Sequence, residues 1–172
     1  MSPGEVLLIK DSSVDLLTVC QAVHWFDLEP FYSEAKRVLK PNGIIALYGY
    51  FSPQVRIEPR VNELINEMYY AKLHKYFHPK SKILEERYVN LEFPFENVHR
   101  STHDFEMKGT LDFLVNWIKT WSGYQEYKKV NGDLRAENLM KEFEEDVSKN
   151  LNSADLKLYC EYFVLIGESK SQ

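Results

Sequence analysis

The segment from Asp11 to Tyr50 reads DSSVDLLTVCQAVHWFDLEPFYSEAKRVLKPNGIIALYGY and decides the fold of the chain. Val14 to Cys20 and Ile44 to Tyr50 are short, mostly apolar runs, typical of strands that are buried on both faces of a parallel sheet. Between these runs, Asp27 is placed to cap a helix, and Pro30 fits the first turn of that helix. The pattern predicts a β-α-β unit.

The predicted helix has one apolar stripe and a sharp end. Its apolar side chains recur at helical spacing, at Phe31, Ala35, Val38 and Leu39. Lys36, Arg37 and Lys40 stand at the end where the helix dipole favours cations, and Pro41-Asn42-Gly43 stops the helix. We therefore expect the stripe to pack on the sheet and the chain to turn directly into the second strand.

This segment resembles the middle of a class I S-adenosylmethionine-dependent methyltransferase of the type 11 group. Five ordered motifs carry the resemblance: DSSVDLL, AVHWFD, EAKRVL, KPNG and IIALYGY. Farther along, YFHP, FPFENV and TWSGYQEYKK are similar to segments of trans-aconitate-methyltransferase-like members. The resemblance implies an α/β fold. It would be a partial Rossmann-like methyltransferase fold with a mostly parallel sheet, one antiparallel strand and an added helical region on the substrate side.

The resemblance covers only the later part of the family's domain. Family members open with a strand that leads into a glycine-rich loop beside the cofactor, followed by an acidic residue that holds the ribose hydroxyls. Met1 to Lys10 resembles only the loop after the family's third strand. We therefore expect the chain to supply the C-terminal, substrate-side portion of the fold. We also expect it to be inactive alone, because the cofactor-binding N-terminal half is absent.

The remaining residues predict a helical cap and a last strand. Helical spacing is found within Ile57 to Leu73, after Thr110 and from Asp133 onward, whereas Leu156 to Ile166 reads as a long strand. By the resemblance, this last strand is antiparallel. We expect a single domain over residues 1–172, with a β-α-β module at 1–56, a mainly helical cap at 57–150 and a terminal strand at 151–172.

Composition argues against several classes of protein. The net charge of -5 and the isoelectric point near 5.6 disfavour a broad phosphate-binding face, so nucleic acid is not expected as a partner. No apolar run approaches the roughly 20 residues that span a bilayer, and Met1 to Lys10 lacks the pattern of a signal peptide. We expect a cytoplasmic protein that does not bind membranes. Cys20 and Cys160 are expected to be reduced and buried.

The stretch from Gln21 to Trp25 is the candidate site. In open α/β sheets, ligands bind beyond the carboxyl ends of the strands, where this loop is predicted to lie. The resemblance implies that Gln21, Ala22, Val23 and Trp25 bind the cofactor, S-adenosylmethionine, and that His24 is the candidate catalytic residue. Simple packing of Trp25 on the following helix and a structural, hydrogen-bonded role for His24 are open alternatives.

The expected reaction is methyl transfer to a small molecule, with a carboxylic acid as one acceptor class. A carboxylate is already ionised near neutral pH and needs only an anchor, whereas a hydroxyl acceptor would give His24 the role of general base. Arg56, Arg60 and Arg87 are conceivable carboxylate anchors. For each of them taken singly, an ordinary solvated surface position is the favoured interpretation.

Aromatic side chains supply the candidate substrate contacts. They make up 14% of the chain, and aromatic faces attract the positive charge of a sulfonium. The candidates are Tyr48, Tyr50, Tyr69 and Trp121. Tyr48 and Tyr50, at the end of a strand, are the better placed pair, because the helical spacing of Trp121 with its aromatic neighbours fits a packed helix face equally well.

Two His-x-x-x-His pairs raise the question of a metal. His74 with His78 and His99 with His103 have the spacing that lets a helix present two ligands. Neither pair has the glutamate of a hydrolytic zinc helix or a nearby cysteine, so the sequence predicts no metal site.

The first predicted strand raises the question of a partner chain. Val14 to Cys20 would lie at an open, apolar sheet edge, which invites pairing with another chain, so a homodimer through this edge is expected. The alternative function is that of a truncated, catalytically inactive product that acts as an interaction module.

Overall fold

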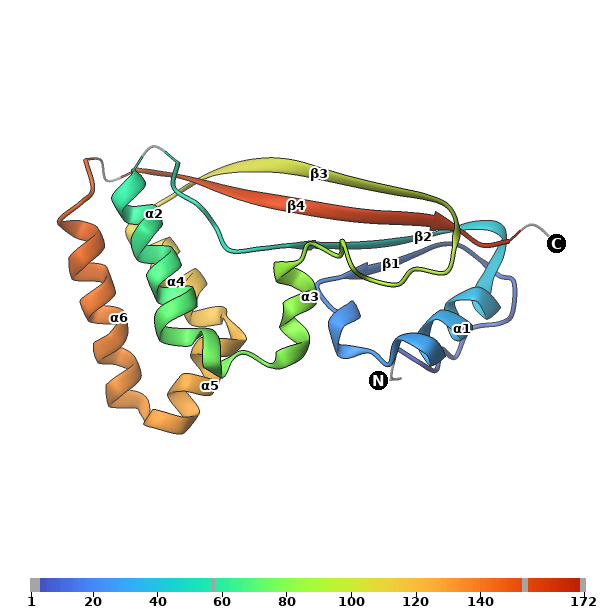
Figure 1. Cartoon of the computed structure of the whole chain (residues 1–172), viewed down its shortest axis with the longest axis horizontal. Coiled ribbons are helices and arrows are strands. Elements are labelled where there is room, and N and C mark those ends of the chain that lie inside the picture. Colours follow the sequence, from blue (N-terminus) through green and yellow to red (C-terminus); the bar gives the residue numbers. More distant parts are fainter. Residues whose placement is uncertain (1–3, 57, 153–154, 171–172) are drawn as a thin grey trace. The chain divides into compact units, whose positions relative to one another are not determined.

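A computed structural model describes residues 4–56, 58–152 and 155–170 of the 172-residue chain. Four strands form one mixed sheet in the order β1-β2-β4-β3 (Figure 1). They are β1 (Val14–Cys20), β2 (Leu39–Tyr50), β3 (Glu96–Gly109) and β4 (Leu156–Glu168). β1 is parallel to β2, and β4 is antiparallel to β2. The expected α/β sheet with an antiparallel last strand is therefore confirmed.

The β-α-β unit is present, with one change at the start of its second strand. β2 begins at Leu39, directly after the helix, and not at Ile44 as the apolar run predicts. Asn42 has a left-handed φ of 61°, and the register with β1 shifts between Val14 and Leu16. The predicted Pro-Asn-Gly turn is thus an irregular start of β2, after which the two strands pair regularly.

Helix α1 (Leu28–Val38) connects the two parallel strands and lies along one face of them (Figure 1). Its buried side chains are Phe31, Tyr32, Ala35 and Val38, so the predicted apolar stripe is confirmed. Asp27 is the N-cap residue of α1, as predicted, but its side chain makes no capping hydrogen bond. The backbone N–H of Asp27 instead donates to Glu5 Oε1 at 2.9 Å.

Burial on the two faces of the sheet is unequal. Along β2 the side with Ile45 and Leu47 is buried, whereas the side with Ile44 and Tyr48 is half-buried. On β1, the Leu16 side chain is 57% exposed and Cys20 is exposed. The prediction of strands buried on both faces, with a buried Cys20, is therefore wrong for the described chain, because α1 packs against only one face. Cys160 is buried, as predicted.

The chain forms two compact units, each with a buried core of its own. The first unit comprises residues 1–51, 80–103 and 162–172, and the second comprises residues 52–79 and 104–161. In the first unit, side chains of β1, β2 and α1 pack with Tyr88 and Leu91. The expected single domain, divided at 1–56, 57–150 and 151–172, stays a prediction.

Helices dominate the second unit. They are α2 (Pro59–Asn66), which continues as the π-helical η2 (Glu67–Leu73), then α4 (Leu111–Thr120), α5 (Ser122–Asn131) and α6 (Asp133–Ser148). Thr110 caps α4 as predicted, since its hydroxyl accepts a hydrogen bond from the Phe113 N–H at 3.2 Å. The short helix η3 (His74–Tyr76) also belongs to this unit, whereas η1 (Val23–Trp25) and α3 (Lys82–Glu85) belong to the first unit, and η4 (Pro79–Ser81) crosses the boundary in sequence. No helix in the described ranges has both the length and the apolar character needed to cross a bilayer.

Candidate functional site

The loop that leaves β1 is tied to the end of β2 by Gln21. The backbone N–H of Gln21 donates to the Tyr48 carbonyl at 3.0 Å, and its side-chain Nε2 donates to the Tyr50 carbonyl at 2.9 Å. Gln21 has a φ of 50°, in the left-handed region that residues other than glycine seldom adopt. The loop therefore has a fixed, strained start at the carboxyl ends of the two parallel strands, where ligands bind in such sheets.

The Gln21 amide has room because residue 49 is glycine. A Cβ atom at Gly49 would lie 2.9 Å from Gln21 Oε1 and 2.8 Å from Phe163 Cε2. Gln21 Oε1 is buried, and within the described residues it accepts no hydrogen bond. Buried acceptors normally have a donor, so this oxygen is a candidate contact for a polar group of a ligand.

The next residues of the loop form one turn of 3-10 helix, η1. The Trp25 N–H donates to the Ala22 carbonyl at 2.9 Å, which holds this turn. Val23 is fully buried, His24 is 5% exposed and Trp25 is 46% exposed, with the last two rings 4.7 Å apart between centroids. Because the Val23 side chain points into the core, its predicted cofactor contact is restricted to its backbone. The cofactor contact of the partly exposed Trp25 and the catalytic role of His24 stay predictions.

Tyr88 is a polar residue of this region that the sequence reasoning missed. It is 1% exposed, and its ring meets Phe163, the neighbour of Gly49, edge to face at 4.8 Å between centroids. Burial raises the pKa of the Tyr88 hydroxyl, with smaller contributions from Cys20 and Tyr32. This hydroxyl is also buried without a hydrogen-bond partner among the described residues. Nothing in the local sequence pattern distinguishes Tyr88 from a surface tyrosine.

Tyr48 and Tyr50 lie on the half-buried side of β2, near the end of the strand, as predicted. Tyr48 stands opposite Cys20 of β1, and the Tyr50 ring is 5.5 Å from that of Tyr162 between centroids. Both side chains keep some exposed surface. Their position near the Gln21 loop keeps them as substrate candidates.

Tyr69 and Trp121 belong to the second unit. Tyr69 is 5% exposed, and its ring centroid is 5.5 Å from that of Trp121 and 4.7 Å from that of Phe77. The two residues are therefore part of an aromatic cluster within that unit, in line with the packed-helix alternative for Trp121. Their contact with a substrate stays a prediction.

Two of the candidate arginine anchors are engaged by acidic neighbours. Arg56 forms a 2.7 Å ion pair with Asp104, and Arg60 forms a 2.8 Å ion pair with Glu63. Both guanidinium groups are about half exposed, where such pairs contribute little to stability. Their geometry agrees with the interpretation as ordinary solvated surface residues.

The histidine pairs do not have helical geometry. His99 and His103 lie on strand β3, where the spacing of four residues does not bring two side chains together as it does on a helix. His78 lies beyond the end of η3. Within the part of the chain that the structure describes, no three His, Cys, Asp or Glu residues are grouped to hold a metal ion.

Comparison with known proteins agrees with the geometry of this site. The family described as Methyltransferase domain matches residues 2–47, a stretch that includes β1, the Gln21 loop and α1. With the mixed α/β sheet and the loop at the carboxyl ends of its parallel strands, this match makes the first part of the chain similar to methyltransferase domains.

Three similar proteins define the extent of the relationship. A Dictyostelium discoideum protein, provisionally described as a methyltransferase, is 28% identical over 156 residues, which are 90% of this chain and 58% of that protein. CRG1 of Saccharomyces cerevisiae, provisionally described as an S-adenosylmethionine-dependent methyltransferase, is 33% identical over 54 residues, which are 31% of this chain and 19% of CRG1. A solved structure from Anaeromyxobacter dehalogenans, described provisionally as a type II methyltransferase, superposes with a TM-score of 0.83 at 23% identity. The superposition covers 99% of this chain and 71% of the Anaeromyxobacter chain. This chain thus spans 58% of the length of the Dictyostelium relative.

Proposed function

We propose that this chain takes part in S-adenosylmethionine-dependent methyl transfer to a small molecule, and that the loop from Gln21 to Trp25 holds part of the cofactor. The observation that carries the proposal is the buried Gln21 Oε1 at the carboxyl ends of β1 and β2, which has no hydrogen-bond partner among the described residues. The strained φ of Gln21 supports it, because such strain is retained most often at functional sites. The family match also includes this loop.

The residues present fit the methionine part of the cofactor. A buried carbonyl oxygen suits an ammonium donor, so Gln21 would accept a hydrogen bond from the amino group, with the Ala22 backbone beside it. The exposed face of Trp25 would border the positive sulfonium. When bound, the cofactor supplies an electrophilic methyl group. The task of the chain is to orient this group and the acceptor and to exclude water.

A carboxylic acid is the acceptor class that we propose. Its carboxylate is ionised near neutral pH, so it needs no base. Tyr48 and Tyr50, whose backbone carbonyls accept hydrogen bonds from Gln21, are the side chains that we propose to contact the acceptor. If the acceptor is a hydroxyl, the His24 imidazole would take the proton. Replacement of His24 by asparagine separates the two cases, because only transfer to a hydroxyl would lose much of its rate.

Calorimetry with S-adenosylhomocysteine tests the cofactor proposal. We would titrate residues 1–172 alone and the same residues fused behind the N-terminal part of the Dictyostelium relative. Micromolar binding is expected in the fused protein, and Gln21→Leu should weaken it about tenfold, because a hydrogen bond to a charged group is lost. Absence of heat in both samples would overturn the proposal, as would unchanged affinity of the Gln21→Leu variant.

A second proposal concerns association of the chain. β1 is the end strand of the sheet, and the 57% exposure of Leu16 leaves an apolar side chain at this edge. We propose a homodimer that pairs along β1, and a purely associating role without catalysis is the rival function that this feature favours. The cytoplasmic location expected from the sequence stays a prediction.

A further inference from the structure

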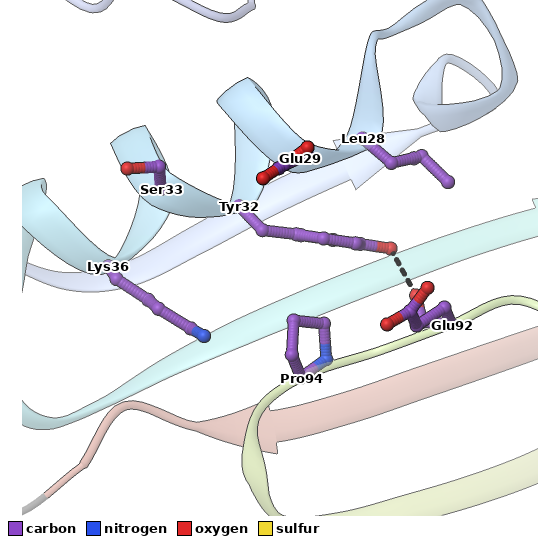
Figure 2. Close-up of a pocket in the computed structure, with 7 residues that line it drawn as sticks. All are labelled: Leu28, Glu29, Tyr32, Ser33, Lys36, Glu92 and Pro94. Carbon is purple, nitrogen blue, oxygen red and sulfur yellow. Dashed lines mark hydrogen bonds between the residues drawn. The ribbon is translucent and has the colours of Figure 1, made fainter.

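A groove of about 470 Å³ lies between α1 and residues 92–94, within the first unit (Figure 2). Its size falls in the range of roughly 300–1,000 Å³ that is typical of small-molecule sites. The residues that line it are Leu28, Glu29, Tyr32, Ser33, Lys36, Glu92 and Pro94. None of them belongs to the Gln21 to Trp25 loop, so the groove is a feature in its own right.

The aromatic wall of this groove is held in place by its surroundings. The Tyr32 hydroxyl donates a hydrogen bond to the Glu92 backbone carbonyl at 2.8 Å, which ties the irregular segment to α1 (Figure 2). The Tyr32 ring also meets Phe93 and Phe95 edge to face, at 6.0 Å and 5.7 Å between centroids. A wall that is fixed in advance lowers the entropy cost of binding a ligand.

Three charged side chains surround this wall. Lys36 and Glu92 lie on either side of Pro94, and Glu29 projects from α1 (Figure 2). Among the described residues, none of these three groups forms an ion pair, although Lys36 Nζ lies 5.3 Å from the centroid of the Phe95 ring. The groove thus presents carboxylates and an ammonium group at separate places along an apolar and aromatic surface.

We propose that this groove binds a zwitterionic small molecule of amino-acid size. Its ammonium group would lie between Glu29 and Glu92, and its carboxylate would meet Lys36. Its apolar part would pack on Tyr32, Leu28 and Pro94. This site is independent of the proposed methyl transfer, because neither proposal uses the residues of the other.

Three probes that share a phenylethyl body separate the parts of the proposal. L-Phenylalanine carries both charges, 2-phenylethylamine carries the ammonium alone and 3-phenylpropionate carries the carboxylate alone. Each is titrated into ¹⁵N-labelled protein while the backbone amide shifts of α1 and residues 92–95 are followed. We expect saturable shifts with L-phenylalanine at a dissociation constant on the order of 1 mM, and about fivefold weaker binding of each single-charge probe.

Charge-removing variants supply the matched controls. Lys36→Met should lower the affinity for L-phenylalanine to that of 2-phenylethylamine and leave 2-phenylethylamine unaffected. Glu92→Gln should lower the affinity for L-phenylalanine toward that of 3-phenylpropionate, since Glu29 remains, and should not weaken the binding of 3-phenylpropionate. Lys40→Met removes a nearby cation that pairs with Asp15 at 2.8 Å and does not line the groove, so it should change nothing. Far-UV circular dichroism checks that each variant folds. The proposal is overturned if no probe gives saturable shifts up to its solubility limit, or if the zwitterion binds no better than the single-charge probes.

Discussion

Arg37 links the N-terminal segment to α1 by several hydrogen bonds. Its guanidinium group donates to the carbonyls of Leu7 and Ile9, each at 2.9 Å, and to both carboxylate oxygens of Glu34, at 2.7 Å and 2.8 Å. It also pairs with Asp11. Only a planar group with several fixed donors satisfies these acceptors together.

Arg37→Lys should therefore lower the urea midpoint of the chain. A lysine ammonium keeps the charge but cannot reach two backbone carbonyls and the Glu34 carboxylate from one position. Arg60→Lys is the control, because Arg60 pairs only with exposed carboxylates and should give a smaller shift. Equal midpoints for the Arg37→Lys variant and the parent would show that the segment does not depend on the guanidinium geometry.

Glu34 should give the stability a specific dependence on acid pH. The Arg37 guanidinium, and then the Leu7 N–H, lower the pKa of the Glu34 carboxyl from its ordinary value of 4.5 to about 2. A folded-state pKa below the unfolded one contributes stability that is present above pH 4.5 and is lost as the pH falls toward about 2. Thermal melts across this range should show a steeper loss for the parent than for Glu34→Gln. Parallel plots of melting temperature against pH for the parent and the Glu34→Gln variant would show that the Glu34 carboxyl does not cause this pH dependence.

Removal of the Tyr88 hydroxyl should stabilise the chain, in contrast to the Arg37 and Glu34 replacements. Its hydroxyl is buried without a partner among the described residues, so its removal should relieve a desolvation cost. Tyr88→Phe keeps the ring against Phe163 and should raise the free energy of unfolding by about 1–3 kcal/mol, measured with urea. A lower midpoint would mean that the hydroxyl contributes to folding in the parent protein.

At the scale of the element, the end of β2 contacts both the core, at Phe163, and the candidate site, at Gln21. An alanine at position 49 would place its Cβ against the Phe163 ring and the Gln21 amide. We expect Gly49→Ala to cost about 1–3 kcal/mol of stability and to weaken S-adenosylhomocysteine binding as well, because Gln21 must shift. Gly132→Ala is the control. Its added Cβ would meet no other atom within 4 Å, but its φ of 87° strains an alanine, so the variant should lower stability without changing affinity. If the Gly49→Ala variant binds S-adenosylhomocysteine as tightly as the parent, the contact between residue 49 and Gln21 does not affect the candidate site.

The elements differ in how well the sequence predicts them. β1 follows from a short apolar run and α1 from an apolar stripe at helical spacing, and β4 follows from the strand predicted at Leu156 to Ile166. The start of β2 at Leu39 and the lack of a side-chain capping bond at Asp27 do not follow from these patterns. Asn42 has a left-handed φ near the start of β2, and the Asp27 N–H donates to the distant Glu5 carboxylate. A local sequence pattern does not reveal contacts between residues that are distant in the chain, such as that of Glu5 with Asp27.

The candidate site was predictable in place but not in detail. The loop after β1 follows from strand topology, and the resemblance supplies its chemistry. The buried acceptor on Gln21 depends on Gly49 and Phe163, which are far along the chain. The position of Tyr88 beside Phe163 is likewise not predictable. It depends on two consecutive residues with left-handed φ, Arg87 and Tyr88, which no pattern in the sequence indicates.

At the scale of the whole molecule, the chain has two cores with no buried residue in common. One is made of strands β1 and β2 with α1, and the other is mainly made of the helices of the second unit. Periodicity predicts which side of each helix is buried, but it does not say which buried sides share a core. The division into two compact units is therefore a result of the structure alone.

The β1 edge makes a prediction about the state of the chain in solution. Among the described residues β1 pairs with β2 alone, and Leu16 is 57% exposed on this edge strand, whose backbone can pair with another strand. Sedimentation should show a dimer or larger species, and Leu16→Lys should shift it to the monomer, because a charged side chain at a sheet edge opposes pairing. Val130→Lys changes a 62% exposed residue on α5 and should leave the association unchanged. A monomeric parent whose β1 amides are nevertheless protected from hydrogen exchange would contradict the proposed dimer and leave β1 as a stable free edge.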